Sequence, residues 1–287
     1  MFRFAADNRP RPAELILAAY FAYTAALASV FPLEAADRLQ ALGASLAALA
    51  ALHCAGRLPN RFAPEILRIT LPVASVLLAY KQIGLFARPQ PDHALERSWV
   101  DWDRLLLSDW GLTRAIDSLG PVLPSLLELL YLLTYAIPLA GLMILAAPPR
   151  LDRADRLLAC FAASAVCAYA LYPYFPSEPP RTIFPGELSG SSDTLLRRIN
   201  WWILGKGGIH TSVFPSGHVS SALGVGIGLL LALPNRKRYG IALIAITPGI
   251  ALATVYGRYH YAVDALAGGA SWACSRLFWR RERENPR

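Results

Sequence analysis

The chain has 287 residues, of which 55% are hydrophobic and 17% are charged, and its mean hydropathy is +0.36. This composition excludes an ordinary soluble domain and is typical of a protein that crosses a membrane several times. The formal charge of +8 does not indicate a nucleic-acid partner, because the basic residues lie in short loops between apolar segments.

Eight apolar runs follow one another along the chain and predict eight membrane-spanning helices. After the polar residues 1–13, the spans are expected at 14–33, 39–55, 66–86, 122–147, 157–174, 213–233, 241–256 and 261–279. The first run is longer than the apolar core of a cleavable signal peptide, so we expect an uncleaved span. The first two runs could instead form one tight hairpin that barely crosses the membrane.

Two polar stretches are expected to lie in the membrane interface. Residues 88–120 are amphipathic and carry three tryptophans, and a second interfacial helix is predicted near 195–204. The tryptophans are Trp99, Trp102 and Trp110. The predicted fold class is all-α, a polytopic membrane helix bundle. It divides into a two-span extension over 1–64, a six-helix core over 65–280 and a basic tail over 281–287.

The four cysteines, Cys54, Cys160, Cys167 and Cys274, all fall inside apolar runs. Their spacing is not that of zinc ligands. We expect small buried hydrophobic side chains and no disulfide framework.

Lysine and arginine placement predicts the orientation in the membrane. Basic residues gather at the N-terminus, at 57–61, at 150–156, at 236–238 and in the tail 280–287. The positive-inside rule therefore places these loops and both termini in the cytoplasm. The other loops, including the long polar segment 175–212, are expected to face the periplasm or a lumen.

Two short motifs lie where polar loops meet apolar helices. Phe214-Pro215-Ser216-Gly217-His218 opens one predicted span, and His260 with Asp264 opens the last one. A histidine that is not a metal ligand can act as nucleophile, general acid or general base. Asp264 lies one helical turn after His260, from where it could hold Nδ1–H and leave Nε2 free to attack. Ser216 and Gly217 precede a helix, whose N-terminus favours an anion.

Each motif taken singly is an ordinary helix start or a polar group at the membrane surface. At matching ends of neighbouring spans, the two motifs predict a phosphate site with a histidine nucleophile. Pro-Ser-Gly-His at 215–218, followed by His-x-x-x-Asp at 260–264, resembles the type 2 phosphatidic acid phosphatase superfamily over roughly residues 65–280. The resemblance implies that His218 is the general acid and that His260 forms a phosphohistidine.

Within that superfamily, the loop 172–181 (Tyr-Pro-Tyr-Phe-Pro-Ser-Glu-Pro-Pro-Arg) and the pair His260-Tyr261 resemble the inositol phosphorylceramide synthase-like branch. The commoner family pattern has an arginine six residues before the nucleophilic histidine. Thr254 stands there in this chain, and Arg258 lies closer to His260. We therefore expect Arg258 to take over the phosphate contact, or else to pair with Asp264 or a lipid headgroup.

Further basic residues are candidates for binding the phosphoryl oxygens, because arginine offers them a bidentate fork. Arg181 stands where the resemblance expects the first phosphate-binding motif. Lys81 and Arg88 match the text of that motif, but two more predicted spans separate them from the Pro-Ser-Gly-His motif. They emerge on the predicted side of the site, where they either reach the phosphate or contact lipid headgroups.

The sequence thus predicts metal-independent phosphoryl transfer on a membrane lipid phosphate. No metal or other cofactor is expected, because the nucleophile is an imidazole and the sequence has no carboxylate cluster for Mg²⁺. Water as acceptor would make a lipid phosphatase, and an alcohol would make a headgroup transferase, such as an inositol phosphate transferase of the sphingolipid type. A lipid transporter is a remoter alternative, since its polar residues would lie in mid-span.

Overall fold

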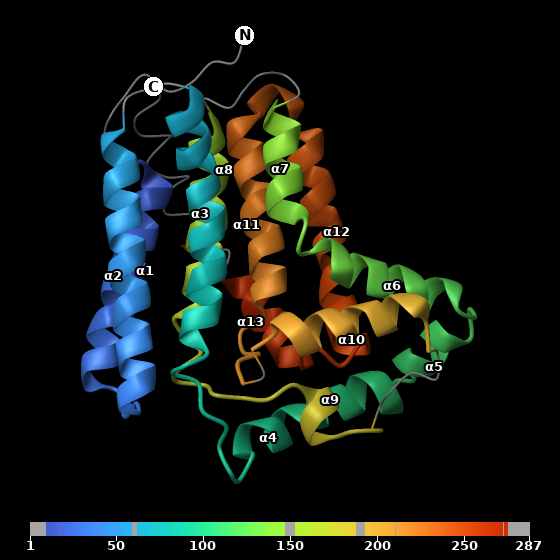
Figure 1. Cartoon of the computed structure of the whole chain (residues 1–287). Coiled ribbons are helices and arrows are strands. Elements are labelled where there is room, and N and C mark those ends of the chain that lie inside the picture. Colours follow the sequence, from blue (N-terminus) through green and yellow to red (C-terminus); the bar gives the residue numbers. More distant parts are fainter. Residues whose placement is uncertain are drawn as a thin grey trace.

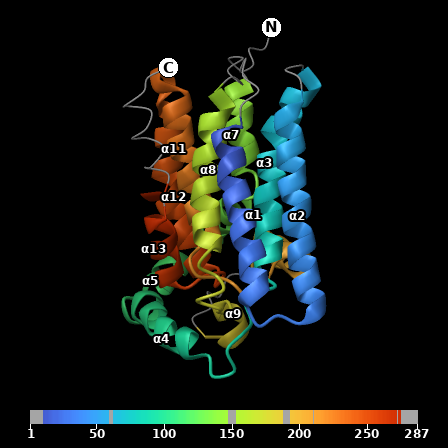
Figure 2. The same cartoon turned by 90° about the vertical axis from the view of Figure 1, so that its left-hand side faces the viewer.

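The computed structural model describes residues 10–58, 62–146, 153–187, 193–209, 211–271 and 273–274. Long helices run side by side through the bundle, and shorter ones lie across one of its ends (Figures 1 and 2). The predicted all-α membrane bundle is confirmed. Among the described residues, four helices are long and apolar enough to cross a membrane, or five if a bent pair counts as one span.

Three long helices make up the N-terminal part of the bundle. They are α1 (Pro12–Val30), α2 (Ala35–Arg57) and α3 (Phe62–Ile83), and each passes the length and hydropathy test for a membrane span. Large apolar side chains point away from the bundle, such as Leu39, which is 72% exposed, and Leu77, which is 63% exposed. Exposed apolar side chains on helices of span length suit contact with lipid.

A buried group of charged side chains ties the N-terminal helices to the rest of the bundle. Arg11 donates to Glu65 at 2.5 Å, and Arg68 donates to both carboxylate oxygens of Glu14 at 2.8 Å. Asp155 lies 3.4 Å from Arg11. All five belong to or directly precede the starts of helices, at the end of the bundle away from the short helices (Figure 1). The division into an extension and a core stays a prediction.

The fourth predicted span, 122–147, is not a straight helix in the structure. It consists of α6 (Val122–Leu133) and α7 (Ile137–Ala146), which meet at an angle of 70°. Pro138 lies in the first turn of α7 and has no N–H to donate to the carbonyl of Thr134, so the helix breaks there. As a result α6 lies across the end of the bundle while α7 runs along it (Figure 1).

Short helices cover the same end of the bundle. After α3 come α4 (Ala94–Asp103), a π-helical turn η1 (Arg104–Asp109) and α5 (Leu112–Asp117), so residues 88–120 contain short helices. The polar segment after the next long helix holds α9 (Pro180–Ile183) and α10 (Leu195–Gly207). Trp102 and Trp110 are 60% and 71% exposed, whereas Trp99 stacks on Phe214 at 5.0 Å.

The centre of the bundle is α8 (Ala154–Tyr169), packed against α11 (Gly217–Ala232). A Cβ at Gly228 would lie 2.6 Å from Leu157 Cα, so glycine lets the two helix backbones come into direct contact. The chain continues through η3 (Pro234–Arg236), α12 (Arg238–Tyr256) and α13 (Ala262–Ala270). The helices α8, α11 and α13 have 16, 16 and 9 residues, fewer than the 18 residues taken as the length of a candidate span. The count of eight spans therefore stays a prediction.

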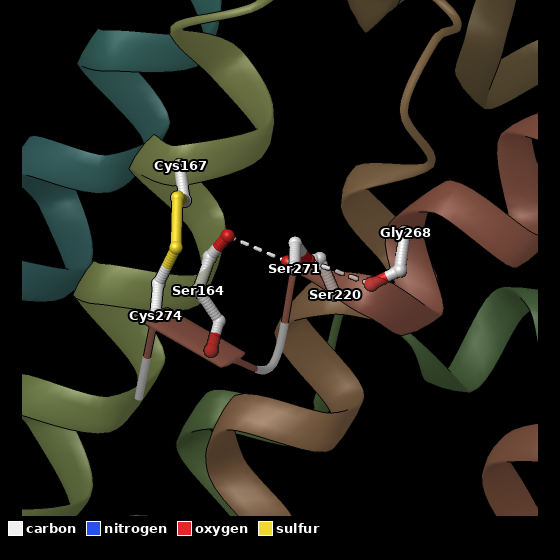
Figure 3. The surroundings of a disulfide bond; sticks show 6 residues. All are labelled: Ser164, Cys167, Ser220, Gly268, Ser271 and Cys274. Carbon is white, nitrogen blue, oxygen red and sulfur yellow. Dashed lines mark hydrogen bonds between the residues drawn. A yellow bond between two sulfur atoms is a disulfide. The ribbon is translucent and has the colours of Figure 1, made fainter. Parts of the chain in front are cut away.

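The expectation that the cysteines form no disulfide framework is wrong for two of them. Cys167 in α8 and Cys274 after α13 form a disulfide, with their Cα atoms 6.8 Å apart (Figure 3). Beside it Ser271 donates to Ser220, which in turn donates to the carbonyl of Ser164. Cys160 is buried, as expected, whereas Cys54 is exposed. The last predicted span beyond residue 274 and the tail 281–287 lie outside the described residues.

Candidate active site

His260 lies in the loop between α12 and α13 and is 5% exposed. Its Nδ1 lies 2.9 Å from the carbonyl oxygen of Val213. Since a carbonyl oxygen can only accept, Nδ1 carries the proton and Nε2 keeps its lone pair. Burial lowers the pKa of His260 to about 3, so the imidazole is neutral at physiological pH. A neutral imidazole with a free Nε2 can act as a nucleophile.

Asp264 has a different first partner from the one expected. Its Oδ2 accepts the backbone N–H of Tyr261 at 2.8 Å and lies 3.4 Å from His260 Nδ1. The carbonyl of Val213 therefore orients the ring, and the carboxyl group of Asp264 lies beside it. A carboxylate at this position favours positive charge on His260 once the ring has been phosphorylated.

His218 lies in the first turn of α11, facing His260. The two ring centroids are 5.6 Å apart, and His218 Nδ1 lies 3.2 Å from Thr134 Oγ1. The hydroxyl of Thr134 donates to the carbonyl of Tyr131 at 2.6 Å, so its oxygen accepts from His218 Nδ1–H. The Nε2 atom of His218 is thereby left for the reacting group.

The break between α6 and α7 supplies residues that sequence reasoning missed. Thr134 lies in the break itself, and the rings of Tyr131 and Tyr135 pack edge-on against His218 at 4.9 and 5.3 Å. A straight span would not have placed them around one histidine. The available sequence signal was Pro138, which follows a Thr-Tyr pair in an otherwise apolar run.

Arg181 follows α8 in the loop that includes α9. Its backbone N–H donates to the carbonyl of Arg258 at 3.3 Å, and its guanidinium lies 5.6 Å from the ring centroid of Tyr259. No carboxylate among the described residues forms an ion pair with Arg181. Burial lowers the pKa of Arg181, and the nearby positive charge of Arg181 also lowers that of His260. A mostly buried guanidinium without a carboxylate partner is suited to an anionic ligand.

Ser216 and Gly217 contribute less backbone to an anion site than expected. The N–H of Ser216 is already donated to the carbonyl of Asp264 at 2.9 Å. The Ser216 hydroxyl is fully buried and has no hydrogen-bond partner among the described residues. A Cβ at Gly217 would meet Tyr169 at 3.0 Å, so Gly217 allows α11 to start close to α8. The hydroxyl of Ser216 remains a candidate donor.

Three further predicted phosphate ligands have protein partners. Lys81 donates to the carbonyl of Gly207. Arg88 pairs with Asp37 and Glu34 on the surface, at 3.4 and 3.8 Å. Arg258 is buried and donates to Asp103 at 2.9 Å. Of this set, Arg258 lies nearest to His260 in the chain.

Another carboxylate, that of Glu128 in α6, supports the loop that carries His260. It is 1% exposed and accepts the hydroxyl of Tyr259 at 2.6 Å, Arg197 Nε at 2.8 Å and Asn200 Nδ2 at 2.8 Å. The ring of Tyr259 stacks on Tyr131 at 3.8 Å. Glu128 thus connects α10 to the residue that precedes His260.

Comparison with known families gives a match to a family described as the PAP2 superfamily, over residues 98–277. The match covers more than half of the chain and includes Arg181, His218, His260 and Asp264, whereas Lys81 and Arg88 lie before it. No curated protein and no solved structure matches the chain.

Proposed function

This chain belongs to the PAP2 superfamily, and we propose that it is an integral-membrane lipid phosphate phosphatase or phosphotransferase that works through a phosphohistidine. The observation that carries this proposal is the facing pair of His218 and His260, whose ring centroids are 5.6 Å apart. Their Nδ1 atoms are both engaged by oxygen acceptors, so both Nε2 atoms are available to one phosphoryl group.

In the first step, Nε2 of His260 attacks phosphorus while the bond from phosphorus to the leaving oxygen breaks. His218, protonated on Nε2, donates that proton to the leaving oxygen. In the second step, His218 takes a proton from water or an alcohol, whose oxygen attacks phosphorus and breaks its bond to His260. The charge on the equatorial oxygens is met by Arg181 and by the hydroxyl of Ser216. Asp264 stabilises positive charge on His260.

The remaining predicted ligands have lesser roles in this mechanism. Gly217 provides close helix packing. Lys81 and Arg88 are proposed to contact lipid headgroups near the site instead of the transferred phosphate, because each already has a protein partner.

An inositol phosphate transferase of the sphingolipid type remains the second candidate, on the strength of the loop that ends at Arg181 and its likeness to the synthase-like branch. The two candidates share the first chemical step and differ in the acceptor. A lipid transporter is disfavoured because the buried charged side chains lie near the starts of the long helices or in the segments that cover one end of the bundle, not in mid-span.

The proposal can be tested with purified protein in detergent and lipid phosphates labelled on phosphorus. Acid-labile, base-stable label on the protein should be trapped in the wild type and lost in His260→Ala, with folding preserved. Added alcohols should divert label from free phosphate to a new lipid or polyol ester if the enzyme is a transferase. Turnover should survive chelators and be blocked by vanadate. The mechanism would be refuted by near-normal turnover of folded His260→Ala protein. A strict Mg²⁺ requirement for phosphoenzyme formation would also refute it.

A further inference from the structure

The loop that carries His260 has an unusual backbone, and one carboxylate bonds to it on both sides of His260. Arg258 has φ +62, in the left-handed region that non-glycine residues rarely adopt, so the loop needs outside support. Asp103, the last residue of α4, is fully buried. Its Oδ2 accepts Arg258 Nη1 at 2.9 Å, and its Oδ1 accepts the backbone N–H of Ala262 at 2.8 Å. One carboxylate therefore ties together the residues that flank His260 on either side.

We propose that Asp103 is a positioning residue for the His260 nucleophile, and that it acts by holding residues 258 and 262 at a fixed separation. The inference rests on the proposed function. It gives α4 a part in the chemistry in addition to anchoring at the membrane surface. It also assigns Arg258 to loop geometry and not to direct phosphate contact.

The electrostatics of the pair agree with this assignment. Burial raises the pKa of Asp103 to about 6, and Arg258 and the Ala262 N–H oppose that rise, so the carboxylate is ionised at neutral pH. An ionised, buried carboxylate is costly unless it is fully hydrogen-bonded. The two bonds to the loop supply that compensation, so displacing the loop would leave a buried charge without a partner.

A matched pair of substitutions on α4 tests the proposal. Asp103→Asn keeps the size of the side chain but removes the charge. Asp101→Asn removes the same charge from the same helix, at a side chain that is 69% exposed and pairs, within the described part of the chain, with Arg104 at 2.9 Å. We measure label trapped on His260, kcat and KM for a lipid phosphate, at a temperature where both variants give one sharp size-exclusion peak.

The expected result is a fall in kcat of about 10- to 100-fold for Asp103→Asn with KM within about twofold, since a misplacement of about 1 Å costs that much in rate. Asp101→Asn should match the wild type. Equal kcat for the two variants overturns the proposal, and so does a raised KM at unchanged kcat. If Asp103→Asn does not fold, Arg258→Lys, which keeps the positive charge, is judged by the same criteria.

A double-mutant cycle separates positioning from direct phosphate binding. If Arg258 acts through Asp103, Arg258→Gln should cost as much as Asp103→Asn, and the double variant should cost no more than either. If Arg258 binds the phosphate directly, Arg258→Gln will weaken vanadate inhibition further in the Asp103→Asn background, and the proposal fails. If no label can be trapped on His260 in the wild-type protein, that result refutes the proposed function instead.

Discussion

Replacing Gly268 should lower turnover, because a side chain at this position would displace the backbone of the motif that carries His218. Gly268 lies in α13 and is buried against Ser216. A Cβ at position 268 would lie 2.5 Å from the carbonyl oxygen of Ser216 and 3.1 Å from its Cβ. That carbonyl also accepts the N–H of Ser220 at 3.1 Å, so it belongs to the fixed first turn of α11.

The size of the effect of Gly268→Ala follows from how far the new Cβ would lie inside the ordinary contact distance. An ordinary contact begins near 3.4 Å, so Gly268→Ala must separate the two backbones by about 0.9 Å. Overpacking of this kind costs about 1–3 kcal/mol in the free energy of unfolding, partly offset by about 1 kcal/mol of helix propensity. Because His218 follows Ser216 directly in the same turn, a shift of about 1 Å should lower kcat about 100-fold.

The neighbouring glycine gives the control. A Cβ at Gly269 would have nothing within 4 Å, and the position is also helical. Gly269→Ala should therefore keep wild-type turnover and raise the free energy of unfolding by up to about 1 kcal/mol. Both variants are compared by phosphate release from a lipid phosphate in micelles and by the midpoint of thermal unfolding. Turnover of Gly268→Ala within about twofold of Gly269→Ala would refute the reasoning.

Three further outcomes are expected. Thr134→Val removes the hydroxyl that accepts from His218 Nδ1–H and should lower kcat about tenfold, whereas Thr134→Ser keeps a hydroxyl and should keep kcat near the wild-type value. Equal rates for the two variants would contradict the assigned hydrogen bond. Because the pKa of His260 is near 3 and that of Asp103 is near 6, the rate of label transfer should fall as pH drops through 6 and Asp103 gains a proton, and Asp103→Asn should flatten this profile. In a protein without other free thiols, a cysteine at Ser191 should react with an impermeant reagent on intact cells and one at Asn235 should not; the reverse pattern would put the site in the cytoplasm. Ser191 lies outside the described residues, so this last expectation rests on the sequence.

The helices and the two motifs could be predicted because they depend on local patterns. Apolar runs specify span-length helices such as α1 and α12, and a Pro-Ser-Gly start specifies the N-terminus of α11. The sequence prediction lacks the bend between α6 and α7, although Pro138 is a signal for it. The run 122–147 is apolar over its whole length, and hydropathy does not show where a helix changes direction, so the pattern predicts one straight span.

Partners that are distant in the chain could not be predicted in the same way. Cys167 and Cys274 are 107 positions apart, and Asp103 and Arg258 are 155 apart. Each pair depends on how helices pack, which no spacing in the sequence encodes. The orienting partner of His260 was missed for a related reason: a backbone carbonyl, that of Val213, has no residue-type signature, whereas Asp264 has one.

The bend between α6 and α7 explains how one segment of the chain can contact both the motif that carries His218 and the loop that carries His260. Glu128 comes from α6 and contacts Tyr259, and Thr134 comes from the break that follows α6 and contacts His218. A straight span would carry one of them away along the bundle. With α6 lying across the bundle end, the same short helix fixes the loop before His260 and the ring of His218. With Asp103 of α4, which bonds to residues on both sides of His260, the segments that lie across the bundle end contact the surroundings of both histidines, whereas α11 carries only His218.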